Sequence, residues 1–432
     1  MSQDDLIERL LGFLRRSPTP WHAAANMASR LEAAGFRRLD ERDAWRLTPG
    51  ERVYVTRNDS SIIALQLPEG ELGALRMIGA HTDSPGLRLK PSAAQTSAGW
   101  LQLGVETYGG MLLAPWFDRD LGLAGRLHVR HPDGRLQGLL LNVERPVAII
   151  PSLAIHLDRD VNQGRAINAQ TQMAPVFLQG GEKGDLERLL KGWIAEQHGL
   201  EGVEILDFEL GFHDMQTPAR VGVAGELVAS ARLDNLLSCF VGLEALLASD
   251  GSQGVVLVAN DHEEVGSASA CGAQGPFLGD VLRRVVEQLG GGGEEAFVRL
   301  IQASRMISCD NAHALHPNFT DKHDAAHGPA LNGGPVIKVN ANQRYATNSA
   351  TAAMFRDLCR EAAVPVQTFV TRADMGCGST IGPITATELG VPTLDVGAPQ
   401  WAMHSIRETA GARDVEYLTR VLAAFCNRAE LA

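Results

Sequence analysis

Histidine and acidic side chains follow short apolar runs at several places in the sequence. His81 and Asp83 come after the apolar start of LRMIGAHTDSPG, and Glu263 and Glu264 follow GVVLVANDH. The others are Asp234 in ARLDN, Asp310 in ISCDNAH and His404 in WAMHSIRE. In open α/β sheets the carboxyl ends of the strands line the crevice that binds ligands. Imidazole and carboxylate groups brought to that edge from distant parts of the chain indicate a metal site.

Each of these residues alone has a simpler interpretation. A single His-x-Asp is usually part of a capped turn, and an aspartate at a helix start, such as Asp234, is more often an N-cap. An isolated Glu-Glu pair is usually solvated. A shared metal site explains better why several charged groups end apolar strands.

The types of these side chains indicate which metal they would bind. Imidazoles and carboxylates without a thiolate fit zinc, manganese or cobalt. Two histidines and at least three carboxylates exceed the needs of one catalytic ion, so two ions about 3.5–4 Å apart are expected, with water between them. A further carboxylate outside the metal ligands could act as a general base. That division would explain the adjacent Glu263 and Glu264, although spacing does not show which glutamate does which.

The elements around these residues predict an α/β fold. Two amphipathic helical patterns fill residues 1–50, and two strands follow in RVYVTRNDSSIIALQL. From residue 91 the chain shows turn signals every 8–12 residues, which indicate a β-rich domain interrupted by the helix DLERLLKGWIAEQHG. Helices and apolar strands return after Leu233. We expect a mixed, mostly parallel sheet flanked by helices in a discontinuous catalytic domain, residues 1–90 and 231–432, with an inserted domain at 91–230.

Composition excludes several classes of protein. The 432 residues predict two or three domains, and 45% hydrophobic with 21% charged residues describe a globular protein. A net charge of −12 argues against a nucleic acid or an anionic membrane as partner. The six cysteines form no C-x-x-C pair, the N-terminus is acidic, and no apolar run approaches the ~18 residues of a membrane span. These features predict a cytoplasmic protein with reduced thiols.

Longer motifs resemble the aspartyl aminopeptidase family of dinuclear metallopeptidases. They are GAHTDSPG, SARLDNL, DHEEVGS, SCDNAHALHPNF, KHDAAHGPALNGGPVIKVNANQRYATN and GCGSTIGPI. The resemblance runs from SPTPWH to MHSIRE and so covers nearly the whole chain. It implies a cytoplasmic aminopeptidase with two divalent ions per subunit, zinc in the first place and cobalt or manganese as alternatives.

The resemblance also implies which residues bind the metals. His81 and Asp310 would bind one ion, Glu264 and His404 the other, and Asp234 would bridge both.

Roles in catalysis and substrate binding are implied for six further residues. Glu263 would be the base that activates water, Asp83 would orient His81, and His313 would steady the substrate carbonyl or its oxyanion. Lys338, Tyr345 and His156 would contact the substrate. His156 belongs to the inserted domain and would complete the site of a neighbouring subunit in a large homo-oligomer, which in this family is a tetrahedral dodecamer with an internal chamber.

Some conspicuous residues remain outside this assignment. We interpret four histidines as loop or packing residues: His262, His316, His323 and His327. Lys338 follows PVI and, apart from the resemblance, could be an exposed strand residue. Ala325 and Ala326 depart from the more acidic tract of the family, which leaves the role of the loop Asp324–His327 open. The cysteines, including Cys377, are expected to be buried small residues.

The resemblance therefore implies a metallo-aminopeptidase acting on peptides, with a preference for N-terminal Asp or Glu and with Lys338 as the countercharge. Three alternatives stay open: a neutral residue preference, a related dipeptidase or deacylase, and an assembly protein that has lost catalysis.

Overall fold

A computed structural model describes residues 3–431 and divides the chain into two compact units. The first contains the chain up to Asp83, Pro218–Met403 and the part from Glu408 onward, and the second contains Ser84–Thr217 and His404–Arg407. The chain passes from the first unit to the second after Asp83 and returns to the first after Thr217. The sequence predicted domain borders after residues 90 and 230. The division into a catalytic and an inserted domain stays a prediction. Every helix among residues 3–431 is too short or too polar to cross a membrane.

The first unit is built on a mixed sheet. Its strands are, in spatial order, β1 (Arg37–Arg38), β2 (Arg52–Arg57), β3 (Ser61–Gln66), β13 (Gly254–Asn260), β4 (Leu75–His81), β14 (Arg305–Cys309), β18 (Thr393–Gly397), β16 (Val336–Val339) and β17 (Gln367–Val370). The neighbours β13, β4, β14 and β18 run parallel, as do β1 with β2 and β16 with β17. Antiparallel pairs join β2 to β3, β3 to β13 and β16 to β18. The predicted mixed, mostly parallel sheet is confirmed.

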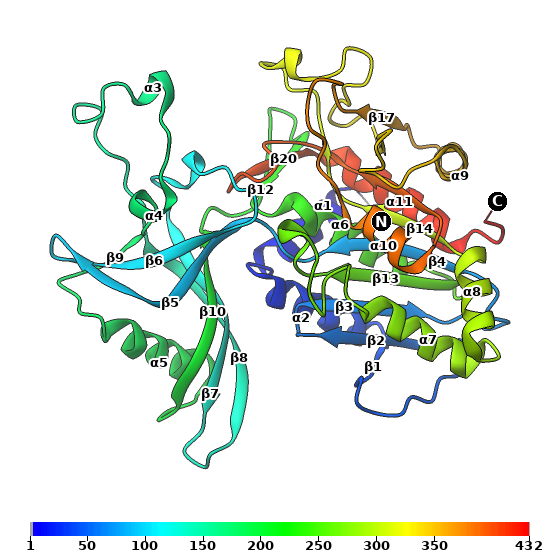
Figure 1. The fold of residues 1–432 in the computed structure, drawn as a ribbon, viewed down its shortest axis with the longest axis horizontal. Helices are drawn as coiled ribbons and strands as arrows, with labels where there is room; N and C mark the ends of the chain where they lie inside the picture. Colours follow the sequence, from blue (N-terminus) through cyan, green and yellow to red (C-terminus); the bar gives the residue numbers. More distant parts are fainter. Residues whose placement is uncertain (1–2, 432) are drawn as a thin grey trace. The chain divides into compact units, whose positions relative to one another are not determined.

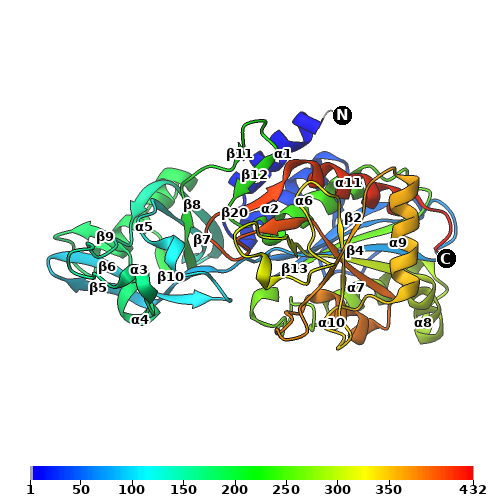
Figure 2. The same cartoon turned by 90° about the horizontal axis from the view of Figure 1, so that it is seen from above.

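Helices cover both faces of this sheet (Figures 1 and 2). One face carries α1 (Gln3–Arg15), α2 (Pro20–Ala33), α6 (Leu233–Leu247), α9 (Ser349–Glu361) and α11 (Ala412–Asn427). The other carries α7 (Phe277–Leu289), α8 (Gly293–Ala303) and α10 (Ile381–Leu389). Strand side chains alternate between faces, so Tyr54 packs into the first core while Val53 and Val55 pack into the second. The predicted α/β class with flanking helices is confirmed.

Several predicted elements have the expected local cause. The turn between β2 and β3 places Asn58 and Asp59 in the left-handed region, which these residue types tolerate. Helix α9 begins after Asn348, whose side chain accepts hydrogen bonds from the backbone of Ala350 and Thr351, as expected of an N-cap. The sequence did not indicate α8 or α10; α10 is short and contains Pro383, so its helical pattern is weak.

A smaller sheet in the first unit consists of β11 (Ala219–Val221), β12 (Leu227–Ser230), β20 (Glu408–Gly411), β19 (Pro399–Trp401) and β15 (Ala312–His313). It fixes the chain segments that follow β14 and β18, because β15 and β19 continue directly from those strands and pair in parallel. His313 lies opposite Gln400 in this pairing.

The second unit contains an antiparallel sheet, which agrees with the expected β-rich texture. Its spatial order is β8 (Leu136–Ala148), β7 (Leu121–Arg130), β10 (Glu204–Asp214), β5 (Gly86–Ser97), β6 (Trp100–Tyr108) and β9 (Val176–Gln179). The predicted helix is α5 (Asp185–His198), whose Leu190, Trp193 and Ile194 pack into the core of this sheet. Two short helices, α3 (Val161–Gly164) and α4 (Ala169–Gln172), complete the unit.

Candidate metal centre

The carboxyl ends of three parallel strands bring the first predicted ligands to one edge of the large sheet. Asn260 at the end of β13 lies opposite His81 at the end of β4. Ser308 of β14 lies opposite Gly79, so Asp310 follows the next strand at nearly the same level. Parallel strands end on the same side of a sheet, which explains why residues so far apart in sequence meet here.

His81 lies at the centre of a cluster of carboxylates. Its Nε2 atom is 3.4 Å from Asp234 Oδ1, 3.7 Å from Asp310 Oδ1 and 3.9 Å from Glu263 Oε2. Donor atoms of His81, Asp234 and Asp310 lie within 4.8 Å of one another, and so do those of His81, Glu263 and Glu264. The structure thus brings five of the predicted site residues together within the first unit.

These separations fit a metal ion held between the donors. Two nitrogen or oxygen ligands bound tetrahedrally at about 2.0–2.2 Å lie roughly 3.3–3.6 Å apart, close to the 3.4 Å between His81 Nε2 and Asp234 Oδ1. His81 Nε2 is buried and makes no hydrogen bond to any described residue. A buried imidazole nitrogen facing carboxylates in this way suits zinc, which binds nitrogen and oxygen ligands.

The charges at this cluster also favour a cation. Burial by itself would lower the pKa of His81, but the carboxylates of Asp234, Asp310 and Asp83 outweigh that effect and raise the pKa well above its ordinary value. The buried carboxylates therefore draw positive charge to His81. A divalent cation at the same point would satisfy them while His81 stays neutral and binds it as a ligand.

The Asp83 carboxylate joins His81 to the segment that carries the two glutamates. Its Oδ1 atom is 3.3 Å from His81 Nδ1 and accepts a hydrogen bond of 3.1 Å from the backbone N–H of Glu263. Its Oδ2 atom accepts one of 3.1 Å from the N–H of Glu264. Because Nδ1 faces Asp83, the ring directs Nε2 toward Asp234 and Asp310, which is the arrangement expected of a metal-binding histidine.

A tight turn explains how adjacent glutamates can face one site. Strand β13 ends at Asn260, His262 has φ of 67°, and Glu263–Val265 form a single 3₁₀ turn that ends at Gly266 with φ of 96°. Successive side chains therefore no longer point to opposite faces as they do in a strand, and both glutamates can face one site. Burial, helped by the neighbouring Asp310 and Asp234, raises the pKa of Glu263 to about 7.

Asp234 enters the cluster from the beginning of α6. Its backbone is not helical, with φ of −82° and ψ of 107°, and the N-cap position belongs to Arg232. The Asp234 N–H donates a 2.9 Å hydrogen bond to Glu408, and Asn235 Nδ2 donates to the Cys309 carbonyl at 2.8 Å. These bonds hold the buried Asp234 beside the end of β14.

Asp310 is fixed by close packing against β18. Its N–H donates to the Val396 carbonyl at 2.9 Å. A Cβ atom at Gly397 would lie only 1.9 Å from the Asp310 carbonyl oxygen and 2.7 Å from its carbon. Glycine at this position lets the two chain segments approach closely enough to hold the Asp310 backbone in place.

Lys338 is a buried cation rather than an exposed strand residue, so that simpler interpretation is wrong. It is 2% exposed, and its Nζ atom lies 3.3 Å from Asp310 Oδ2. The same atom donates a 3.3 Å hydrogen bond to the Asn311 carbonyl and lies 5.1 Å from the centroid of the Tyr345 ring. Its charge thus partly balances a predicted metal ligand.

A pocket of about 310 Å³ in the first unit contains two of the predicted substrate-site residues, His313 and Tyr345. Among the described residues its lining does not include Lys338. It does include two histidines that we interpreted as loop or packing residues, His316 and His323. The same lining holds the cationic side chains Lys322 and Arg372 and the aromatic side chains Phe369 and Trp401.

Sequence reasoning missed Arg372 as a pocket residue. Arg372 follows the end of β17 at Val370, so the rule that polar residues after apolar strands line a site would have found it. Arg372 is held by an ion pair with Asp374 at 2.6 Å and by a hydrogen bond to the carbonyl of Asp321.

Two predicted site residues belong to the second unit. His404 has φ of 68°, and its Nδ1 atom is 2.8 Å from the Gly110 carbonyl oxygen. His156 is exposed in the segment after β8. Their roles, like those of the other site residues, stay predictions.

Comparisons with known proteins agree along nearly the whole chain. A family model described as Aminopeptidase I zinc metalloprotease (M18) matches residues 13–426. The probable M18 family aminopeptidase 2 of Pseudomonas putida (strain GB-1) is 56% identical over 433 residues, which cover 99% of this chain and 100% of that protein.

Solved structures are also similar to this protein along nearly the whole chain. A chain in the cryo-electron microscopy structure of the Ape4 and Nbr1 complex has a TM-score of 0.95 and 39% identity, covering 98% of this chain and 85% of that chain. The mApe1 dodecamer of S. cerevisiae has a TM-score of 0.85 and 26% identity, covering 98% and 96%.

Replacing Asp83 with asparagine should weaken metal binding about 10- to 100-fold, because an amide NH₂ would face either His81 Nδ1–H or a backbone N–H. Zinc affinity measured by competition with a chromophoric chelator checks this. Asp43→Asn, at an exposed aspartate, is the matched control. Unchanged zinc affinity in Asp83→Asn would show that the Asp83 carboxylate does not orient His81, and would leave that role to the Asp83 backbone carbonyl, 3.1 Å from His81 Nδ1.

Proposed function

Because the chain belongs to the M18 family of zinc aminopeptidases, we propose that it removes N-terminal residues from peptides with two zinc ions and a glutamate base. The convergence of His81, Asp234, Asp310, Glu263 and Glu264 at one sheet edge carries this proposal. Family membership favours an aminopeptidase over the dipeptidase, deacylase and non-catalytic alternatives.

The proposed ligands divide between two ions. His81 and Asp310 would hold one, Glu264 and His404 the other, and Asp234 would bridge them. The 2.8 Å contact of His404 Nδ1 with the Gly110 carbonyl oxygen supports this role, because a carbonyl accepts the Nδ1 proton and so fixes the tautomer and the orientation of the ring. When bound, the zinc ions supply Lewis acidity, which polarises the scissile carbonyl and makes water easier to deprotonate.

Glu263 would move the protons of the reaction. Its carboxylate lies at the edge of the cluster, 3.9 Å from His81 Nε2, and its backbone is fixed by Asp83. It would take a proton from the attacking water and return it to the leaving amine when the peptide bond breaks. Tyr345 and His313 would position the substrate, with His313 near the oxyanion.

Two variants should separate the roles of the adjacent glutamates. Glu263→Gln should keep both zinc ions and lose turnover by about 10²–10⁴-fold, since the base is gone. Glu264→Gln should lose zinc, since a ligand is gone. Elemental analysis together with steady-state kinetics checks both. Wild-type turnover in Glu263→Gln, or zinc loss in that variant rather than in Glu264→Gln, would contradict the assignment.

A preference for N-terminal Asp or Glu is supported by the cations in the pocket. Lys322 and Arg372 line it together with His313 and Tyr345. Lys338, the countercharge expected from the sequence, already lies 3.3 Å from Asp310 and so shares its charge with a predicted ligand. Arg372 also shares its charge, with Asp374 at 2.6 Å, but unlike Lys338 it lines the pocket. We therefore propose Arg372 as a second candidate partner for the substrate carboxylate.

Arg372→Leu should lower kcat/KM for Asp- and Glu-p-nitroanilides roughly 10- to 100-fold, the effect of losing one charged hydrogen bond. Hydrolysis of the leucine substrate should change little. Arg360→Leu is the matched control, because Arg360 also pairs with an aspartate two to three residues away, Asp357. Equal losses on acidic and neutral substrates would refute a role of Arg372 in selectivity, and a wild-type preference for leucine would refute the acidic preference.

Self-association into a homo-oligomer is supported by exposed apolar side chains around His156. Leu153, Ile155 and Leu157 are 52%, 46% and 74% exposed. Apolar side chains gathered on one surface segment usually mark an interface. The similar mApe1 of S. cerevisiae forms a dodecamer. We propose a tetrahedral dodecamer in the cytoplasm, with His156 reaching a neighbouring site.

Leu157→Asp should shift the native mass of the protein toward smaller species, because a buried carboxylate opposes association. Leu136→Asp is the matched control, since Leu136 is also exposed (63%) in the second unit but lies far from His156 in sequence. Native mass spectrometry measures both. A wild-type monomer with full activity would contradict the oligomer.

A further inference from the structure

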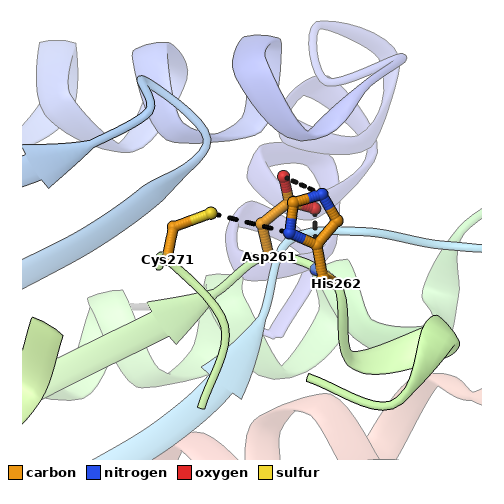
Figure 3. Close-up of side chains that lie close together, drawn as sticks. All are labelled: Asp261, His262 and Cys271. Carbon is orange, nitrogen blue, oxygen red and sulfur yellow. Dashed lines mark hydrogen bonds and ion pairs between the residues drawn. The ribbon is translucent and has the colours of Figure 1, made fainter. Parts of the chain in front are cut away.

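A second cluster of metal-binding side chains lies beside the segment of the two glutamates. It consists of Asp261, His262 and Cys271, whose donor atoms lie within 4.8 Å of one another. Figure 3 shows the Cys271 thiol pointing at the His262 imidazole, with the Asp261 carboxylate against the same ring. His262 Nδ1 is 3.5 Å from Cys271 Sγ, and His262 Nε2 is 3.5 Å from Asp261 Oδ2.

The backbone around this cluster is fixed at both ends of its loop. Ser61 of β3 accepts a 2.8 Å hydrogen bond from the Asp261 N–H and donates one of 2.9 Å to the Cys271 carbonyl. Asn260 Nδ2 donates a further bond of 3.0 Å to the same carbonyl. Asp261 and Cys271 are buried. The three side chains are therefore brought together by the fold and not by chance on a mobile surface.

The donor set is one that thiophilic cations prefer. Thiolate, imidazole and carboxylate are the three ligand types of zinc sites. Sulfur and nitrogen ligands at about 2.3 and 2.0 Å from one tetrahedral ion lie roughly 3.5 Å apart, the distance found between His262 Nδ1 and Cys271 Sγ.

The thiol also has the chemistry of a ligand. Burial alone would raise the pKa of Cys271, but hydrogen bonds with His262 and Ser269 outweigh it and bring the pKa below its ordinary value. The hydrogen bond with Cys271 also raises the pKa of His262, so a cation bound by this pair would displace a proton from it.

We propose that Asp261, His262 and Cys271 form a third metal site, for a thiophilic divalent cation of the zinc and cadmium class. A water would complete the coordination, because Ser269 Oγ lies 2.8 Å from His262 Nδ1, which is the length of a hydrogen bond and too short for two ligands of one ion. The site shares no residue with the proposed catalytic ligands. It lies directly before Glu263 in the chain, so a bound ion fixes the turn that presents both glutamates.

Cadmium titration of the zinc-loaded protein tests this site. A thiolate bound to Cd²⁺ gives an ultraviolet charge-transfer band, and none of the proposed catalytic ligands is a thiolate. We expect the band to saturate at one equivalent of Cd²⁺ per chain. It should be lost in Cys271→Ser and retained in Cys377→Ser, the control at the half-buried cysteine. His262→Gln should weaken Cd²⁺ binding at least tenfold.

A wild-type protein without the band, or a band that survives Cys271→Ser, would overturn the proposal. Thermal unfolding of each variant shows whether it is folded, and a folded Asp261→Asn variant with weakened Cd²⁺ binding gives a second test if Cys271→Ser does not fold. The band is read without peptide substrate. The cadmium test of the third metal site is therefore independent of the aminopeptidase proposal, which Glu263→Gln and Glu264→Gln test.

Discussion

The buried carboxylate of Asp83 is the interaction on which the candidate centre depends. It lies 3.3 Å from the imidazole of His81 at the end of β4 and accepts backbone hydrogen bonds from Glu263 and Glu264 beyond β13. One side chain thus links the nitrogen ligand of one strand to both glutamates of the next. A full charge in this position is stable because backbone N–H groups and the imidazole surround it.

Charge balance is the second constraint. Asp83, Asp234 and Asp310 are buried within a few ångströms of His81. Carboxylates removed from water in this way need compensating positive charge. Lys338 supplies part of it at Asp310, and the raised pKa of His81 shows that the remaining demand falls on the imidazole. A zinc ion bound at this cluster would meet that demand, and metal binding would then be coupled to folding.

The sequence predicted several of the residues that meet in the first unit, but not the arrangement that brings them together. Polar residues directly after apolar strands marked His81, Glu263 and Asp310, because parallel strands share an edge. The order β13–β4–β14 and the register that aligns them depend on contacts between distant segments, which no local pattern records. For the same reason the burial of Lys338 and the pocket position of Arg372 were not foreseen. The short α10 was missed because its few buried residues make a weak apolar period, although Thr380 caps its start and Gly390 ends it.

The close approach of Gly397 to the Asp310 carbonyl bears on how this protein can diverge. Position 397 offers no functional group, yet a single methyl there would overlap the backbone of a proposed ligand. We therefore expect homologues that keep the metal centre to keep glycine at this position. Asp310 would be retained for its carboxylate oxygens, and Gly397 for its lack of a side chain.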